Sequence, residues 1–126
     1  MTSFELDPRL ARDTIFLGRL SLCELRLMND QRWPWVVLVP LRENAVDIHA
    51  LAQSDQDLLS RETSLVASTL MRLTNCEKIN SAALGNIVRQ LHVHVVARSA
   101  GDPNWPGPVW GFGERTPYGQ EARHLL

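Results

Sequence analysis

The chain lacks the features that mark several classes of protein. It has two cysteines among 126 residues, Cys23 and Cys76, and they do not form a CxxC pair. It has no hydrophobic run of membrane-spanning length, and no basic start followed by an apolar segment that would suggest a secretory signal. These absences argue against a disulfide scaffold, a membrane protein and a secreted protein. We therefore expect a cytoplasmic protein with reduced thiols and no membrane partner.

An excess of charge of one sign is also lacking. The 13 basic and 14 acidic residues give a formal net charge of −1, which does not favour binding to duplex nucleic acid. Hydrophobic residues make up 44% of the chain and charged residues 21%, as in ordinary globular proteins. The length suits one domain with a core and is too short for two. We expect a single domain over residues 1–126, with a core at about 14–98 and a tail at 99–126.

The stretch from 90 to 98 contains the residues with the clearest chemical potential. Polar and apolar residues alternate from Gln90 onward, which predicts a strand with one face on the core. Every second side chain of a strand points the same way, so Gln90, His92 and His94 should share one face. The opposite face, which we expect to lie on the core, consists of Leu91, Val93 and Val95.

The residues of this stretch are compatible with four interpretations. The first is a solvated strand face whose polar residues have no function. The second is a zinc site, because histidines at i and i+2 on a strand can bind zinc, although no cysteine or acidic residue lies within four positions of the pair. The third is nucleophilic catalysis, in which one imidazole attacks and its neighbour stabilises charge or protonates the leaving group. The fourth is anion binding without turnover.

Residues 90–96 read Gln-Leu-His-Val-His-Val-Val, which resembles the signature of the histidine triad (HIT) superfamily, His-φ-His-φ-His-φ-φ, where φ is apolar. Gln90 stands where the family has its first histidine. The resemblance covers about residues 14–98, over which the chain is similar to bacterial diadenosine tetraphosphate hydrolase-like HIT proteins. It continues upstream in three segments, which lie at 27–29, 36–42 and 85–86. It implies an α+β fold with a five-stranded, mainly antiparallel sheet and one long packed helix, and it requires no metal and no cofactor.

The resemblance also implies roles for the three polar residues. His92, at the middle position, would attack the α-phosphorus of a nucleotide and form a covalent nucleotidyl-histidine that water then cleaves. Gln90 would orient the His92 ring through its backbone carbonyl and contact phosphate with its side chain. His94 would stabilise the transition state and the leaving group. The small-molecule partner would be a nucleotide, such as a dinucleoside polyphosphate or a nucleoside phosphoramidate. Gln90 cannot titrate as the histidine at the first position of the family signature can, and this could weaken turnover. The alternative is therefore a nucleotide-binding or regulatory module with weak turnover.

Further positions of the family pattern predict contacts with the substrate. Gly85 permits a tight backbone close to an anion, and by the resemblance the loop of Gly85 and Asn86 binds phosphate. Asn29 matches a residue that binds ribose, although an asparagine after a strand is as often a plain turn-former. Asn80 resembles an amide residue that contacts the phosphate chain, with a one-residue gap in the alignment. Trp35 lies in a stretch where the family often has Pro-Gly-His.

Periodicity and capping signals place the remaining elements. We expect a short turn after Asp7-Pro8 and a long helix from about 55 to 73, beginning at the capping-box pattern Ser54-x-x-Asp57 and ending at Asn75. His49 is interpreted as a surface histidine. Strands are expected at 14–17, 20–28, 36–39 and 77–83, the first two meeting in a hairpin at Gly18-Arg19.

Composition changes after Arg98. Residues 99–126 contain five glycines, four prolines and two tryptophans, and few aliphatic residues. The segment cannot form a core alone, but it is too aromatic for a disordered linker. We expect its rings to pack either on the core of the same chain or across a homodimer near a histidine site. Because a small domain offers little further inner space, the homodimer is the favoured expectation.

Overall fold

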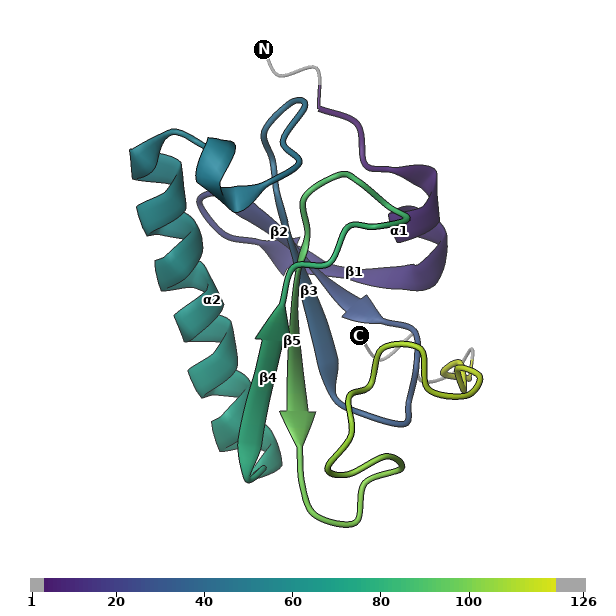
Figure 1. Cartoon of the computed structure of the whole chain (residues 1–126). Helices are drawn as coiled ribbons and strands as arrows, with labels where there is room; N and C mark the ends of the chain where they lie inside the picture. Colours follow the sequence, from purple (N-terminus) through teal and green to yellow (C-terminus); the bar gives the residue numbers. More distant parts are fainter. Residues whose placement is uncertain (1–3, 120–126) are drawn as a thin grey trace.

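The computed structural model describes residues 4–119 and contains a five-stranded antiparallel sheet with one long helix, α2, along one face (Figure 1). The strand order is β1-β2-β3-β5-β4. The predicted α+β fold is therefore confirmed. The elements are α1 (Pro8–Asp13), β1 (Thr14–Arg19), β2 (Cys23–Met28), β3 (Trp35–Pro40), η1 (Ile48–Ala50), α2 (Gln53–Thr74), β4 (Lys78–Ala82) and β5 (Val93–Arg98).

Strand β5 is an inner strand, paired with β3 on one side and β4 on the other. His94 lies opposite Val37 of β3 and Ala82 of β4. Every residue of β5 is buried, as is every residue of β3. The centre of the sheet is therefore covered on both faces, which fixes the register of these strands strongly.

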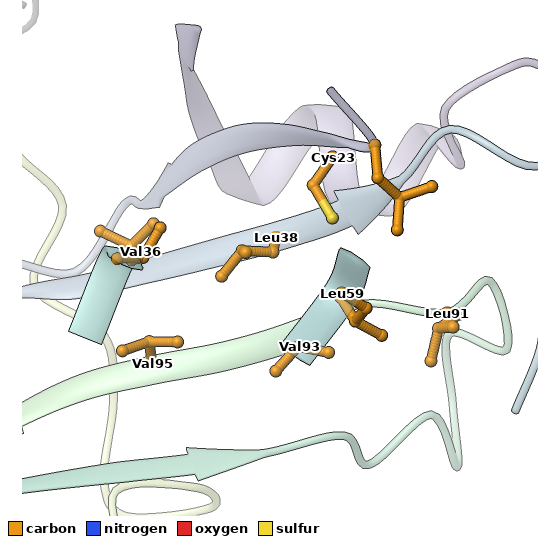
Figure 2. Close-up of a cluster of buried hydrophobic side chains, with 9 residues drawn as sticks. Cys23, Val36, Leu38, Leu59, Leu91, Val93 and Val95 are labelled. Carbon is orange, nitrogen blue, oxygen red and sulfur yellow. The ribbon is translucent and has the colours of Figure 1, made fainter. Parts of the chain in front are cut away.

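One core lies between the sheet and α2, and Figure 2 shows most of its side chains. The apolar face predicted for the histidine stretch, namely Leu91, Val93 and Val95, belongs to this core, as expected. The helix also contributes a buried carboxylate. The Glu62 side chain accepts hydrogen bonds from the backbone N–H groups of Leu22 and Cys23, each at 2.9 Å. This carboxylate satisfies two buried donors where the chain turns into β2.

A second core lies on the sheet face opposite α2, where Figure 1 shows α1 and the yellow C-terminal segment. The N-terminal segment, α1 and the tail place apolar side chains against β3 and β5. The tail therefore packs within its own chain, where it covers a face of the sheet, and the favoured expectation that its rings pack across a homodimer is not needed to bury them. The buried residues of this core are Leu10, Met28, Trp33, Trp35, Val37, Val39, Val96 and Val109.

Several element boundaries differ from the sequence expectation. The hairpin turn predicted at Gly18-Arg19 is wrong, because both residues belong to β1 and pair with β2, and the chain turns at 20–22 instead. The strand predicted from Gln90 begins only at Val93. The second strand begins at Cys23 and not at Leu20, because Leu20 donates to the Cys23 carbonyl in a turn. Helix α2 begins at Gln53, with Ala52 as an N-cap that makes no side-chain hydrogen bond, so the expected capping at Ser54 is wrong. A turn of 3-10 helix directly precedes it and fixes its entry.

The expected helix ends are otherwise present. The Asp7 side chain accepts from the Arg9 N–H and Pro8 occupies the first turn, so α1 forms as the capping signal predicts and runs on to Asp13. Asn75 ends α2 in the left-handed region, at φ 53°. Among residues 4–119, no helix is both long enough and apolar enough to cross a bilayer. Both cysteines are free thiols.

Candidate active site

The two histidines lie side by side at the beginning of β5. His92 immediately precedes the strand, His94 is its second residue, and their ring centroids are 4.9 Å apart. The first interpretation, a solvated strand face, is wrong, because His92 and His94 are only 7% and 5% exposed. Residues of the second core cover this face of the sheet. The pair therefore lies in a partly water-excluded setting, where hydrogen bonds and charges act more strongly than in water.

His92 is oriented by the backbone. Its Nδ1 lies 2.7 Å from the carbonyl oxygen of Gln90, the contact that the family resemblance implied. A carbonyl oxygen can only accept, so Nδ1 is the donor in this pair. Because the partner is a main-chain atom, the substitution of glutamine for the first histidine leaves this contact intact.

His94 is held through the same ring nitrogen, but by a donor. The indole Nε1–H of Trp35 donates to Nδ1 of His94 at 3.0 Å. The rings of Trp35 and Trp110 contact the imidazole, with centroid distances of 5.6 and 5.7 Å. Burial, together with the nearby His92, lowers the pKa of His94 from 6.5 to about 3. The His94 ring is therefore uncharged at neutral pH.

The Gln90 side chain has a different partner from the one expected. Its Oε1 accepts from the Asp7 N–H at 2.8 Å, and its Nε2 donates to the Glu5 carbonyl at 2.8 Å. The Gln90 side chain is therefore not positioned to contact phosphate as expected, because its oxygen and its nitrogen are both hydrogen-bonded to the N-terminal segment. The glutamine instead joins the strand of the histidines to the segment that covers them.

A cavity of about 360 Å³ lies beside His92. Its lining includes the backbone turn at Gly85, where φ is +74° and a side chain would be strained. Asn86 is exposed directly after this turn. His49, which we expected at the surface, is exposed and also lines this cavity. The structure thus brings the predicted phosphate loop and His92 together, and it adds a histidine that periodicity could not connect to them.

A second cavity, of about 470 Å³, lies beside His94. Strand residues form one side, and tail residues 110–115 form the other. Trp35, Trp110 and Phe112 give it an aromatic lining, with ring centroids of Trp35 and Trp110 6.3 Å apart. The aromatic tail therefore shapes a pocket within the same chain.

The structure does not bring the other two asparagines to the histidine pair. The Asn29 side chain accepts from the Tyr118 N–H at 2.9 Å, so it binds the tail. Asn80 lies opposite Val96, beyond His94 along the strand, and its side-chain oxygen accepts from Arg98 at 2.8 Å. Both residues hold other parts of the chain in place.

The tail is anchored by a buried guanidinium. Arg98 is 1% exposed and donates to the Asp102 carboxylate at 2.7 and 3.1 Å, and to the Gly107 carbonyl at 2.7 Å. The rings of Trp33 and Trp105 each lie 5.8 Å from the guanidinium carbon. These contacts fix the course of the tail and so place Trp110 against His94.

Sequence reasoning missed Trp35 and Trp110 as direct neighbours of His94. Trp35 was noted only as a departure from the family pattern, and no periodic signal joins it to a residue 59 positions away. Trp110 belonged to the segment expected to pack, without an indicated position. Among residues 4–119, no three side chains of His, Cys, Asp or Glu come together in a way that could hold a metal ion.

Comparison with known proteins agrees with this geometry. The family model described as the HIT domain matches residues 9–101. A histidine triad (HIT) protein from Sinorhizobium meliloti 1021 is 57% identical, and the match covers 98% of this chain and 91% of that one, with a TM-score of 0.95. A histidine triad protein from Marinobacter aquaeolei VT8 is 46% identical, with 97% and 89% covered and a TM-score of 0.94.

A third solved structure, of a histidine triad protein from Bradyrhizobium japonicum, is 42% identical over 97% of this chain and 92% of that one, with a TM-score of 0.92. Among curated proteins there is no significant match. Because the family model spans most of the chain and these structures share its fold nearly end to end, the protein belongs to the histidine triad (HIT) family.

Proposed function

We propose that this protein is a nucleotide hydrolase or nucleotidyl transferase acting at the α-phosphorus of a dinucleoside polyphosphate, such as diadenosine tetraphosphate, or of a nucleoside phosphoramidate. HIT proteins generally act on nucleotides. The observation that carries the proposal is the 2.7 Å contact between Nδ1 of His92 and the Gln90 carbonyl. It places the proton of the neutral His92 ring on Nδ1 and leaves the lone pair on Nε2, ready to attack.

The reaction has two steps. In the first, the Nε2 lone pair of His92 forms a bond to the α-phosphorus, and the bond from phosphorus to the leaving group breaks, with its electron pair going to the leaving group. In the second, a water oxygen forms a bond to the same phosphorus and releases a proton to solvent, the nitrogen–phosphorus bond returns its electrons to His92, and a nucleoside monophosphate leaves. One water is consumed in all. In a transfer reaction another acceptor would take the place of water.

The neighbouring residues have supporting roles. Gln90 holds the nucleophile through its carbonyl, and His94 stabilises the phosphoryl group as it reacts. Gly85 and Asn86 lie at the turn that borders the cavity beside His92, where backbone N–H groups can meet phosphate oxygens. We assign Asn29 and Asn80 to anchoring the tail and not to the substrate, because their side-chain oxygens already accept hydrogen bonds.

The decisive experiment compares the wild-type chain with His92→Ala and His94→Ala, using diadenosine tetraphosphate and a fluorogenic adenosine phosphoramidate. We expect His92→Ala to lose several orders of magnitude in rate, because no other group can form the intermediate. His94→Ala should lose less, about 10²–10³-fold, because it removes one hydrogen-bond donor to the reacting phosphoryl group. Circular dichroism checks that each variant is folded. Retention of about a tenth of the wild-type turnover by His92→Ala would show that the nucleophile is wrongly assigned.

A direct measurement of the intermediate complements the rates. A reaction quenched in alkaline denaturant should give a chain whose mass is increased by one nucleotidyl group, and the increase should be absent from His92→Ala. Binding of nucleotide without turnover and without this adduct would favour the alternative, a nucleotide-binding module that has lost activity. Gln90 is the specific reason to keep that alternative, because it removes a titratable group beside His92.

We also propose that the protein is a cytoplasmic homodimer. The free thiols of Cys23 and Cys76 suit a reducing compartment. The end strand β4 pairs on one side only, and α2 exposes Leu65 and Leu73 at 53% and 75%, so a partner has both a sheet edge and an apolar helix surface to use. The tail packs within its own chain, so it no longer argues for a partner. Light scattering at micromolar concentration should give twice the chain mass, and a monomer would refute the proposal.

A further inference from the structure

The two catalytic imidazoles are bonded through the same ring atom to partners of opposite kind. Nδ1 of His92 faces a carbonyl oxygen, which only accepts. Nδ1 of His94 faces the indole N–H of Trp35, which only donates. In the uncharged rings, the proton of His92 therefore lies on Nδ1 and that of His94 on Nε2. Nε2 of His92 therefore carries a lone pair, whereas Nε2 of His94 carries an N–H group.

A positive charge on His94 is opposed from several directions. A second proton would have to go on Nδ1, where it would face the Trp35 N–H and break a buried hydrogen bond. The ring contacts of His94, within residues 4–119, are Trp35, Trp110 and His92, none of which carries negative charge. Trp35 itself is only 5% exposed, so water cannot readily replace its N–H.

The charged groups near this ring are already paired or lie at the rim of the adjoining cavity. They come from the turn after β2 and from the tail. Asp30 forms an ion pair with Arg32 at 2.8 Å, and Arg115 forms one with Asp13 at 3.3 Å. Glu114 also lines the cavity and is exposed. None of the described hydrogen bonds joins a carboxylate to His94, so nothing on this side offsets the cost of protonating it.

Building on the proposed function, we propose that Trp35 is a positioning residue for His94. Its indole N–H holds His94 as the uncharged Nε2–H tautomer, so that His94 donates a hydrogen bond to a phosphoryl oxygen and does not supply a proton to the leaving group. The leaving group must then depart with the electron pair of the broken bond and no proton from the enzyme.

This assignment selects a substrate class. A nucleoside polyphosphate leaves as a stable anion, because phosphate groups ionise with a pKa of about 6. An alkylamine needs a proton to leave, because its conjugate acid has a pKa of about 10. The site therefore favours dinucleoside polyphosphates over phosphoramidates with alkylamine leaving groups. The wild-type chain should hydrolyse the former faster at equal concentration.

The first test needs neither a variant nor a substrate. In the full chain labelled with ¹⁵N-histidine, long-range ¹H–¹⁵N spectra between pH 5 and 8 report which ring nitrogen carries the proton. We expect His94 to be protonated on Nε2 alone, with no titration in this range. A proton on Nδ1, or a titration near pH 6.5, would overturn the proposal. Because no turnover is involved, this result is independent of whether the proposed reaction occurs.

The second test uses Trp35→Phe with Trp110→Phe as the matched control. Both replacements remove one indole that contacts His94, but only Trp35 donates a hydrogen bond to it. Trp35→Phe should let Nδ1 of His94 take up a proton at higher pH. It should also raise the rate on an alkylamine phosphoramidate, relative to the dinucleoside polyphosphate, by about 3- to 10-fold, the worth of one hydrogen bond.

Trp110→Phe should leave both the tautomer and this ratio at wild-type values, whatever its effect on the absolute rate. If the Trp35→Phe chain keeps the wild-type spectra and the wild-type ratio, the indole does not control His94 and the proposal fails. If that variant does not fold, the spectra of the wild-type chain still decide the matter. If no nucleotide is turned over at all, the proposed function fails while the tautomer remains measurable.

Discussion

Replacing Arg98 with methionine should strongly destabilise the fold, because this residue joins the tail to the sheet. Methionine keeps much of the apolar stem but removes the guanidinium. Asp102 then loses its two arginine hydrogen bonds while its side chain stays 11% exposed, and the carbonyl of Gly107 and the Asn80 oxygen each lose a donor.

The expected loss follows from the charge left behind. The Asp102 carboxylate would keep the backbone N–H groups of Ser99 and Asn104 as partners but would have no cation beside it. Removing one partner of a buried ion pair costs about 3–5 kcal/mol, which is a large share of the 5–15 kcal/mol that typically stabilises a domain. For a chain of this size the melting temperature should fall by roughly 10–20 °C.

Urea denaturation followed by tryptophan fluorescence measures the change in the free energy of unfolding. Arg72→Met, in the exposed last turn of α2, is the matched control and should change it by less than about 0.5 kcal/mol. The double variant Arg98→Met with Asp102→Asn should recover part of the loss, because no charge is then stranded. A loss below about 1 kcal/mol for Arg98→Met would refute the anchoring role.

Two further predictions concern stability. The unfolded chain protonates His94 near pH 6.5, whereas the folded ring has a pKa of about 3, so the free energy of unfolding should fall as the pH is lowered through this window, by about 1.4 kcal/mol per pH unit. His94→Gln should flatten the curve between about pH 6.5 and 5, above the range where most carboxylates titrate. Glu62→Ala should cost about 3 kcal/mol in urea denaturation, because it strands the N–H groups of Leu22 and Cys23, and a loss below 1 kcal/mol would contradict this.

Periodicity predicted those features of the fold that depend on the residue pattern within a single helix or strand. The apolar residues Leu91, Val93 and Val95 face α2, as their alternation indicated. The end of α2 at Asn75 was readable because asparagine tolerates the left-handed backbone there. The start of β2 was not readable from periodicity, since it follows a turn in which Leu20 donates to the Cys23 carbonyl, and Glu62, about 40 positions away, accepts from the N–H groups of Leu22 and Cys23.

The histidine pair was found in the sequence, but its surroundings were not. Alternation shows that one face of a strand is on a core, and it leaves open whether the other face meets water or a second layer. Here the second layer comes from two distant segments, the N-terminal residues bonded to Gln90 and the tail fixed by Arg98. The contact of Trp35 with His94 depends on strand pairing, which a single sequence does not specify.

The composition of the tail nevertheless carried part of this information. A segment rich in tryptophan and glycine after an inner strand must bury its rings, and a polar row beside it must satisfy its hydrogen bonds once covered. These two needs meet at His94, where Trp110 covers the imidazole and Trp35 bonds to its nitrogen. Each need alone allows many structures. The structure meets both with the histidine row inside the protein, and because Nδ1 of His94 accepts from an N–H donor, this buried ring is uncharged.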